Sequence, residues 1–315
     1  MERKNIAGMS MKGGKKDNFF FCQIEFFEDQ NRWFLRSLLQ VKDEAGREGD
    51  EAIHAWIEDL NVKELIVDFP LTSPACQTCE IQCPGIKKCP VPTVNAVQEG
   101  ISNILAEDAR LNKENPKRYE QERNKDDEFD FSKDILSKES THHILSRAFK
   151  RRLKKGFTPY WNRTLDFWVW TRYYDQLLSL FNSSFDSFAN TSLMILSRFA
   201  FLRRHFPPQL ELFEGNINIA LIELLRAGII LKKDIINMYD MELCIEARLD
   251  IIKKIESKLN IFIYDNDLEV IVKNPRAFNS FILAVIGQSI HLESSRELPE
   301  WTLPSESKFI VPSFD

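Results

Sequence analysis

The hydrophobic pattern at the start of the chain predicts a small antiparallel sheet. Residues 5–10, 19–27 and 33–41 are runs rich in strand-forming residues, separated by polar segments that include a predicted turn at 11–18. Three such runs joined by short connections are typical of a β-meander. The next run predicts a helix, because its apolar residues recur at helical spacing; they are Ala52, Ile53, Trp56, Ile57 and Leu60.

A fourth strand is predicted where Leu65, Ile66 and Val67 form an uninterrupted apolar run. Such a run suits a strand that is buried on both faces of a sheet. Asp68 ends the run, and Pro70 cannot extend it, since proline has no N–H to donate to a neighbouring strand. An acid at the carboxyl end of a buried strand is a common position for chemistry in open α/β sheets. The same residue can also merely cap a turn.

The rest of the chain combines helical periodicity with a few further strand signals. Mixed charges dominate residues 106–139, so a solvated helix end and a mobile connection are expected there. The expected elements are helices at 94–111, 192–206, 217–225, 231–259 and 278–290, a strand at 210–214, and a hairpin that pairs 261–264 with 269–272.

Four of the six cysteines are crowded around the turn-forming pair Pro84-Gly85, and these are Cys76, Cys79, Cys83 and Cys89. Four thiolates can close a tetrahedral zinc site or hold an iron–sulfur cluster. The spacing is tighter than in the usual zinc ribbon, but zinc is favoured over the cluster. Reduced or disulfide-linked cysteines without a metal are the third option. This is the most specific chemical signal in the sequence.

The segment 147–155 is strongly basic and contains no acid; its charged residues are Arg147, Lys150, Arg151, Arg152, Lys154 and Lys155. Aromatic residues follow closely, at positions 160, 161, 168, 170, 173 and 174. Basic residues followed by aromatic ones can bind phosphates and stack on bases. A solvated basic helix face ahead of an aromatic core helix would give the same pattern. The sequence leaves both interpretations open.

Length and composition are those of a globular protein. The chain has 315 residues, of which 43% are hydrophobic, enough for a substantial core in one large domain or two. No apolar segment follows the charged N-terminus, and the longest apolar stretch carries charges, so we expect a cytoplasmic protein without a secretory signal. The net charge of −5 argues against indiscriminate nucleic-acid binding but permits a local basic patch.

The predicted order of elements, with an acid ending the fourth strand, is that of the ribonuclease-H-like fold. Short segments spread over nearly the whole chain resemble the family catalogued as domain of unknown function 429, whose members are predicted ribonuclease-H-like nucleases. These segments are IVDFPLT (66–72), SRAFKRRLKKGFTP (146–159), LFEGNINIALIELL (212–225), RAFNSFILAVIG (276–287) and FIVP (309–312).

The resemblance implies an α/β fold with a ribonuclease-H-like mixed sheet, in which three antiparallel strands are joined by parallel strands and flanked by helices. We predict a single domain over residues 1–315. Within it, residues 73–92 form a Cys-rich metal loop, and residues 106–206 form a mainly helical insertion rich in charged and aromatic residues.

The resemblance also implies a carboxylate site that holds Mg²⁺ or Mn²⁺ through Asp68 and Glu214, with Glu211 as the alternative to Glu214. Two positions depart from the family pattern: Ser10 stands where the first strand usually presents an acid, and Asn279 where the last helix usually presents an aspartate. Two-metal hydrolysis needs enough carboxylate charge to hold two cations about 4 Å apart. We therefore expect a divergent protein that binds DNA or RNA with a weakened or lost metal site. The alternative is an active metal-dependent nuclease in which Asn279 is a neutral ligand.

Overall fold

The computed structural model describes residues 4–11, 19–41, 46, 49–123, 144–188 and 191–314. Residues 12–18 of the turn predicted at 11–18, and the predicted connection beyond residue 123, lie outside these ranges. The chain divides into two compact units. Unit 1 consists of Met1–Leu71, Thr191–Arg296 and Lys308–Asp315, and unit 2 of Thr72–Asn190 and Glu297–Ser307.

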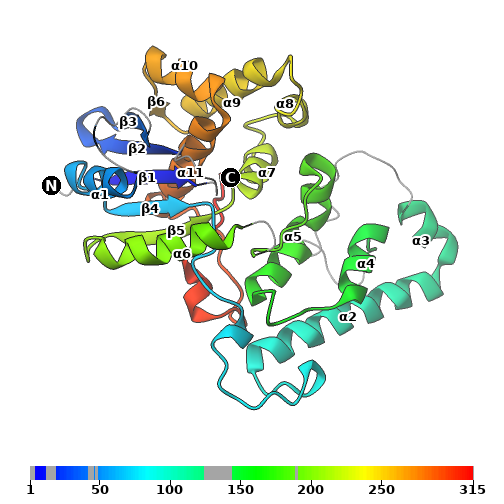
Figure 1. The fold of residues 1–315 in the computed structure, drawn as a ribbon. Helices are drawn as coiled ribbons and strands as arrows, with labels where there is room; N and C mark the ends of the chain where they lie inside the picture. The colour runs from blue at the N-terminus through cyan, green and yellow to red at the C-terminus, as the bar shows by residue number, and fades with distance from the viewer. Residues whose placement is uncertain are drawn as a thin grey trace. The chain divides into compact units, whose positions relative to one another are not determined.

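Unit 1 is built around a seven-stranded mixed sheet with the order β6-β3-β2-β1-β4-β5-β7 (Figure 1). Neighbours β1, β2 and β3 pair antiparallel, and every other neighbouring pair is parallel. The strands are β1 (Asn5–Ser10), β2 (Phe20–Phe27), β3 (Arg32–Gln40), β4 (Glu64–Val67), β5 (Glu211–Gly215), β6 (Ile261–Phe262) and β7 (Phe309–Ile310). The predicted meander and the predicted strands at 65–67 and 210–214 are confirmed.

Helices flank this sheet, as the apolar periodicity predicts. They are α1 (Gly49–Asp59), α6 (Leu193–Leu202), α7 (Ile217–Arg226), α8 (Lys232–Asn237), α9 (Cys244–Lys258), α10 (Asp265–Lys273) and α11 (Pro275–His291). Helix α11 crosses β1 at Gly8, where a Cβ atom would lie 2.2 Å from the carbonyl oxygen of Ser280. Only glycine allows so close an approach, and the central helix is therefore fixed against the central strand.

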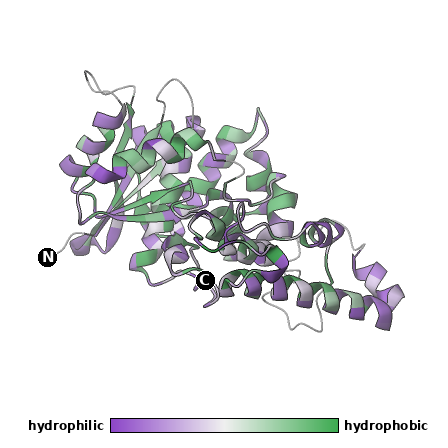
Figure 2. Ribbon diagram, turned by 60° about the horizontal axis from the view of Figure 1, so that its bottom comes forward, coloured by the Kyte–Doolittle hydropathy of each residue, from purple (hydrophilic) through white to green (hydrophobic). Residues whose placement is uncertain are grey.

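The central strands carry the core of unit 1. All six residues of β1 are buried, and Leu65, Ile66 and Val67 of β4 have no exposed surface. The strands are coloured mainly as hydrophobic in Figure 2. A parallel strand covered on both faces requires such a continuous apolar sequence. On one face, Phe19 and Phe21 pack on Trp56 of α1.

The predicted hairpin of residues 261–264 and 269–272 is wrong. Residues Ile261 and Phe262 form a two-residue strand that pairs in parallel with β3, and the second half of the expected hairpin lies in α10. Asp265 and Asp267 occupy the first turn of that helix and Lys273 its last turn. Acids in the first turn and a lysine in the last turn interact favourably with the helix dipole and stabilise the helix. This stabilisation outweighs the strand preference of the valine and isoleucine residues in the segment.

Unit 2 is helical. Its helices are α2 (Pro92–Glu114), α3 (Pro116–Arg123), α4 (Arg147–Lys155) and α5 (Thr164–Phe181), and two 3₁₀ turns precede α2, at Ala75–Gln77 (η3) and Ile86–Lys88 (η4). Their apolar faces meet in a cluster that we call the unit 2 core, which includes Val94, Phe149, Leu153, Phe157 and Trp170. No helix in the described ranges is both long enough and apolar enough to cross a bilayer.

Candidate functional site

The carboxyl ends of β1 and β4 bring Ser10 and Asp68 together. These strands are parallel neighbours, and Met9 is in register with Val67. The Ser10 hydroxyl donates a hydrogen bond of 2.5 Å to Oδ2 of Asp68, and the Met11 N–H donates one of 3.3 Å to Oδ1. The hydroxyl that replaces an expected acid therefore binds Asp68 as a donor instead of adding a second negative charge.

Glu214 reaches the same end of the sheet, and Glu211 does not. Glu214 is in register with Val67 and is 5% exposed, and its Oε2 accepts a hydrogen bond of 3.0 Å from the Leu71 N–H. Glu211 lies at the amino end of β5, where its exposed carboxylate pairs with Lys308 at 2.8 Å. Of the two acids, Glu214 is therefore the one at the same end of the sheet as Asp68, and its carboxylate binds the segment that follows Asp68.

Helix α11 contributes a residue that the sequence did not single out. The Ser280 hydroxyl accepts a hydrogen bond of 3.3 Å from the Ser10 N–H and donates one of 2.8 Å to the carbonyl of Phe20. It thus joins β1, β2 and α11 beside the expected site. Its neighbour Asn279 is half-buried on the same helix. A serine inside an apolar helix gives no signal of this role, because the role depends on which strand the helix crosses.

The four cysteines lie on the loop that precedes α2. Cys79 and Cys83 are exposed, whereas Cys76 and Cys89 are half-buried. Burial raises the pKa of the Cys76 thiol, and the thiols of Cys89, Cys79 and Cys83 raise it further. Among the described residues, no group of three or more His, Cys, Asp or Glu side chains has the arrangement of a metal site.

The six basic residues of α4 fall into two sets. Lys150 points inward and forms an ion pair with Asp108, which has no exposed surface. Asp108 also accepts hydrogen bonds of 2.9 Å from the Tyr119 hydroxyl and 3.0 Å from the Leu145 N–H. A buried carboxylate needs such partners. Lys150 therefore joins α4 to α2 and α3.

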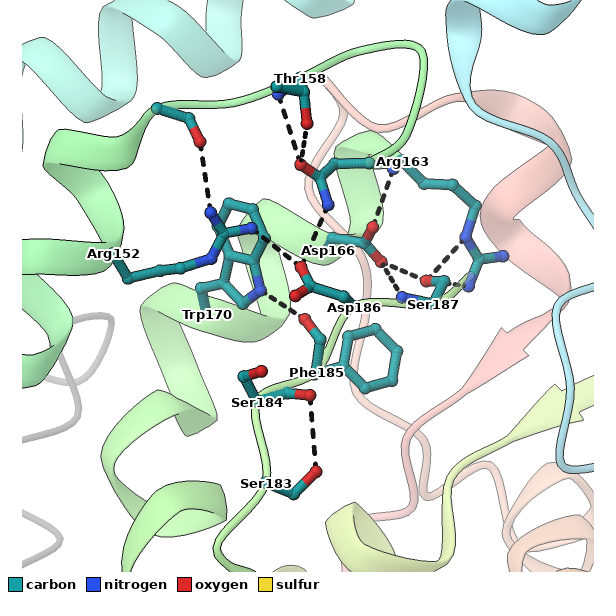
Figure 3. Close-up of polar contacts among 12 residues, drawn as sticks. Arg152, Thr158, Arg163, Asp166, Trp170, Ser183, Ser184, Phe185, Asp186 and Ser187 are labelled. Atoms are coloured by element: carbon teal, nitrogen blue, oxygen red, sulfur yellow. Dashed lines mark hydrogen bonds and ion pairs between the residues drawn. The ribbon is translucent and has the colours of Figure 1, made fainter. Parts of the chain in front are cut away.

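Arg152 is the second inward-facing residue, as Figure 3 shows. Its guanidinium lies 3.6 Å from the centre of the Trp170 ring and 2.8 Å from a carboxylate oxygen of Asp186. Trp170 donates in turn a hydrogen bond of 2.5 Å to the carbonyl of Phe185. The planar guanidinium therefore stacks on an aromatic ring and at the same time pairs with an acid inside unit 2.

The remaining four basic residues form an exposed row that we call the α4 stripe, consisting of Arg147, Arg151, Lys154 and Lys155. Their spacing of four, three and one residues places them on one face of the helix. Arg147 lies 3.8 Å from Glu120, and Arg151 donates to the carbonyl of Arg147. Of the aromatic residues that follow, Trp168, Trp170 and Tyr173 are buried, whereas Tyr160 and Trp161 are 59% and 47% exposed.

A buried polar network holds the start of α5 (Figure 3). Arg163 and Asp166 have no exposed surface. The Arg163 guanidinium donates to the Ser187 hydroxyl at 2.6 and 2.9 Å and to the Thr72 hydroxyl at 2.8 Å. Asp166 accepts from the Arg163 N–H at 2.9 Å and from Ser187. The sequence does not single out this network, because Ser187 and Thr72 lie 24 and 91 residues from Arg163 along the chain.

Asp166 makes the stability of unit 2 depend on pH. Burial raises the pKa of its carboxyl to about 6 despite the opposing effect of Arg163, and the charge of Asp186 raises it slightly further. Below about pH 4 the carboxyl is protonated in both the folded and the unfolded chain. Between about pH 4 and 6 only the folded chain keeps the proton. We therefore expect the free energy of unfolding to fall by up to about 3 kcal/mol as the pH rises through this window.

Urea denaturation followed across that pH range measures the effect. Asp166→Asn should remove most of the dependence of the free energy of unfolding on pH. Asp250→Asn, a change of an exposed acid on α9, should leave this dependence unchanged. Glu306, whose pKa burial also raises, adds to the slope in the same direction. A wild-type slope that persists in Asp166→Asn would show that this carboxyl is not its source.

No protein-family model, curated protein or solved structure matches this chain.

Proposed function

We propose that this protein binds nucleic acid through the α4 stripe and that its sheet is a ribonuclease-H-like frame with a weakened divalent-metal site. The observation that carries the binding function is the division of the basic residues of α4. Lys150 and Arg152 are largely covered and pair with Asp108 and Asp186 of unit 2, so the fold explains their charges. The other four, Arg147, Arg151, Lys154 and Lys155, are exposed in one row, and of these Arg147 lies 3.8 Å from Glu120. A row of positive charges on an otherwise acidic chain favours a polyanionic partner.

The geometry of the stripe fits a phosphodiester backbone. Its residues span about 12 Å along the helix at 1.5 Å per residue. This length is comparable to three or four phosphate spacings of one strand at about 3.4 Å each in duplex DNA, and to fewer in an extended strand. Tyr160 and Trp161 follow directly and expose much of their rings, which are the side chains on which unpaired bases stack. This combination favours single-stranded DNA or RNA over duplex.

The proposed frame rests on the strand order and on the residues at the strand ends. The segment β3-β2-β1-β4-β5, antiparallel in its first three strands and parallel afterwards, is the arrangement that the family resemblance implies. Asp68 and Glu214 lie at the carboxyl ends of neighbouring strands and fit the oxygen ligands that Mg²⁺ and Mn²⁺ prefer. Ser10 and Asn279 supply no charge. Asp68 and Glu214 also already accept hydrogen bonds from Ser10, Met11 and Leu71.

Binding of fluorescently labelled strands of about 20 nucleotides, measured from about 50 to 200 mM salt, tests this function. Four side-chain cations that neutralise phosphates release counterions from the strand. We therefore expect the logarithm of the association constant to fall with the logarithm of the salt concentration, with a slope of about −2 to −3 for single strands. No binding at the lowest salt, or binding independent of salt, would refute the proposal. The same mixtures with Mg²⁺ or Mn²⁺ should show absent or very slow cleavage. Rapid cleavage that Asp68→Asn abolishes would instead establish the nuclease.

A further inference from the structure

The cysteine loop and the basic helix share one core. Ala75 and Cys89 of the loop pack against the unit 2 core, to which α4 contributes Phe149 and Leu153. The far end of the loop is attached to α2, because the Gln98 side chain donates a hydrogen bond of 2.7 Å to the carbonyl of Ile86. The loop is therefore anchored near both ends, while the two exposed cysteines lie between the anchors.

A backbone hydrogen bond joins this loop to the turn that follows α4. The Cys76 N–H donates to the carbonyl of Pro159 at 3.0 Å. The turn is tight, since the N–H groups of Trp161 and Asn162 both donate to the carbonyl of Thr158, at 2.8 and 2.7 Å. At its apex are the exposed rings of Tyr160 and Trp161. The position of Cys76 thus bears directly on the segment that presents these two rings.

We propose that one Zn²⁺ binds Cys76, Cys79, Cys83 and Cys89, that it draws together thiols which the described structure does not hold in the arrangement of a metal site, and that the ion, by fixing Cys76, orders the Thr158–Asn162 turn. Four thiols lose their protons to solvent as four Zn–S bonds form, and a tetrahedral shell of thiolates is a stable structural zinc site. Gly85 has a φ of +93°, a conformation that glycine adopts freely, and this bend lies between Cys83 and Cys89. An effect of the ion on the stacking of bases rests on the proposed function, whereas the ordering of the turn by the ion does not.

Zinc binding is tested first on the full-length, reduced, metal-free protein, by competition with a chromogenic chelator. We expect about one Zn²⁺ per chain. The double change Cys79→Ser and Cys83→Ser should weaken binding at least about 100-fold, and it should leave the metal-free fold intact because both side chains are exposed. Cys244→Ser, on α9, is the matched control. Purified protein that holds iron and sulfide, or wild-type affinity in the double variant, would refute the site.

Amide hydrogen exchange of residues 156–163, with and without Zn²⁺, tests the ordering of the turn without nucleic acid. We expect zinc to slow exchange about tenfold in the wild type and not in the double variant. Equal exchange rates with and without bound zinc would refute the coupling. Zinc should also tighten single-strand binding about tenfold, the effect of one better-ordered stacking side chain. Slower exchange without any nucleic-acid binding would support the coupling and refute only the proposed function.

Discussion

Reversing two charges of the α4 stripe, with Arg151→Glu and Lys154→Glu, should weaken binding to single-stranded nucleic acid by about 100- to 1000-fold. Both side chains are exposed, so the helix should keep its fold. Each reversal replaces an attraction to phosphate by a repulsion. At about 1 kcal/mol for each unit of charge in contact with water, the four units amount to roughly 4 kcal/mol before screening by salt. Fluorescence anisotropy at about 100 mM salt measures the loss.

The matched control for this variant reverses Lys253 and Lys258, two exposed lysines of α9 in unit 1. It makes the same change in net charge at a different place, so a general effect of charge would weaken binding equally in both proteins. We expect the control to lose less than about tenfold. If the α4 variant binds as tightly as the wild type, the stripe is only a solvated helix face.

Arg163→Met should lower the free energy of unfolding of unit 2 by about 3–5 kcal/mol. Methionine fills much of the space of the arginine stem but cannot donate to the hydroxyls of Thr72 and Ser187. It also leaves the buried carboxylate of Asp166 without the opposing charge of Arg163. A buried carboxylate that loses a nearby positive charge is strongly destabilising, because nothing then offsets its lost hydration.

Urea denaturation followed by tryptophan fluorescence reports on this change, since Trp168 and Trp170 are buried in α5. Arg118→Met, a change of an exposed arginine in α3, is the control and should alter stability by less than about 0.5 kcal/mol. Adding Asp166→Asn to Arg163→Met should recover part of the loss, because it removes the uncompensated charge. A loss below about 1 kcal/mol in Arg163→Met would mean that the network contributes little to stability.

Much of unit 1 could be predicted from the sequence, because its signals are local. An apolar run such as 65–67 specifies a strand buried on both faces wherever it pairs, and helical periodicity specifies the apolar face of α1 or α11. Pro70 cannot pair with a neighbouring strand, so the sequence predicts that the strand ends at Asp68. The hairpin predicted for 261–272 failed because a short apolar run fits either element, and the charges of α10 decided it.

The sequence by itself determined that α4 would be basic, that four cysteines would share one loop, and that an acid would follow the fourth strand. Only the tertiary structure decided which charges are available. Lys150 is held by Asp108 and Arg152 by Asp186, acids 42 and 34 residues away. The composition and periodicity of a segment indicate whether one face or both faces of its helix or strand are buried. They do not report which distant side chain lies opposite, since that depends on the path of the whole chain.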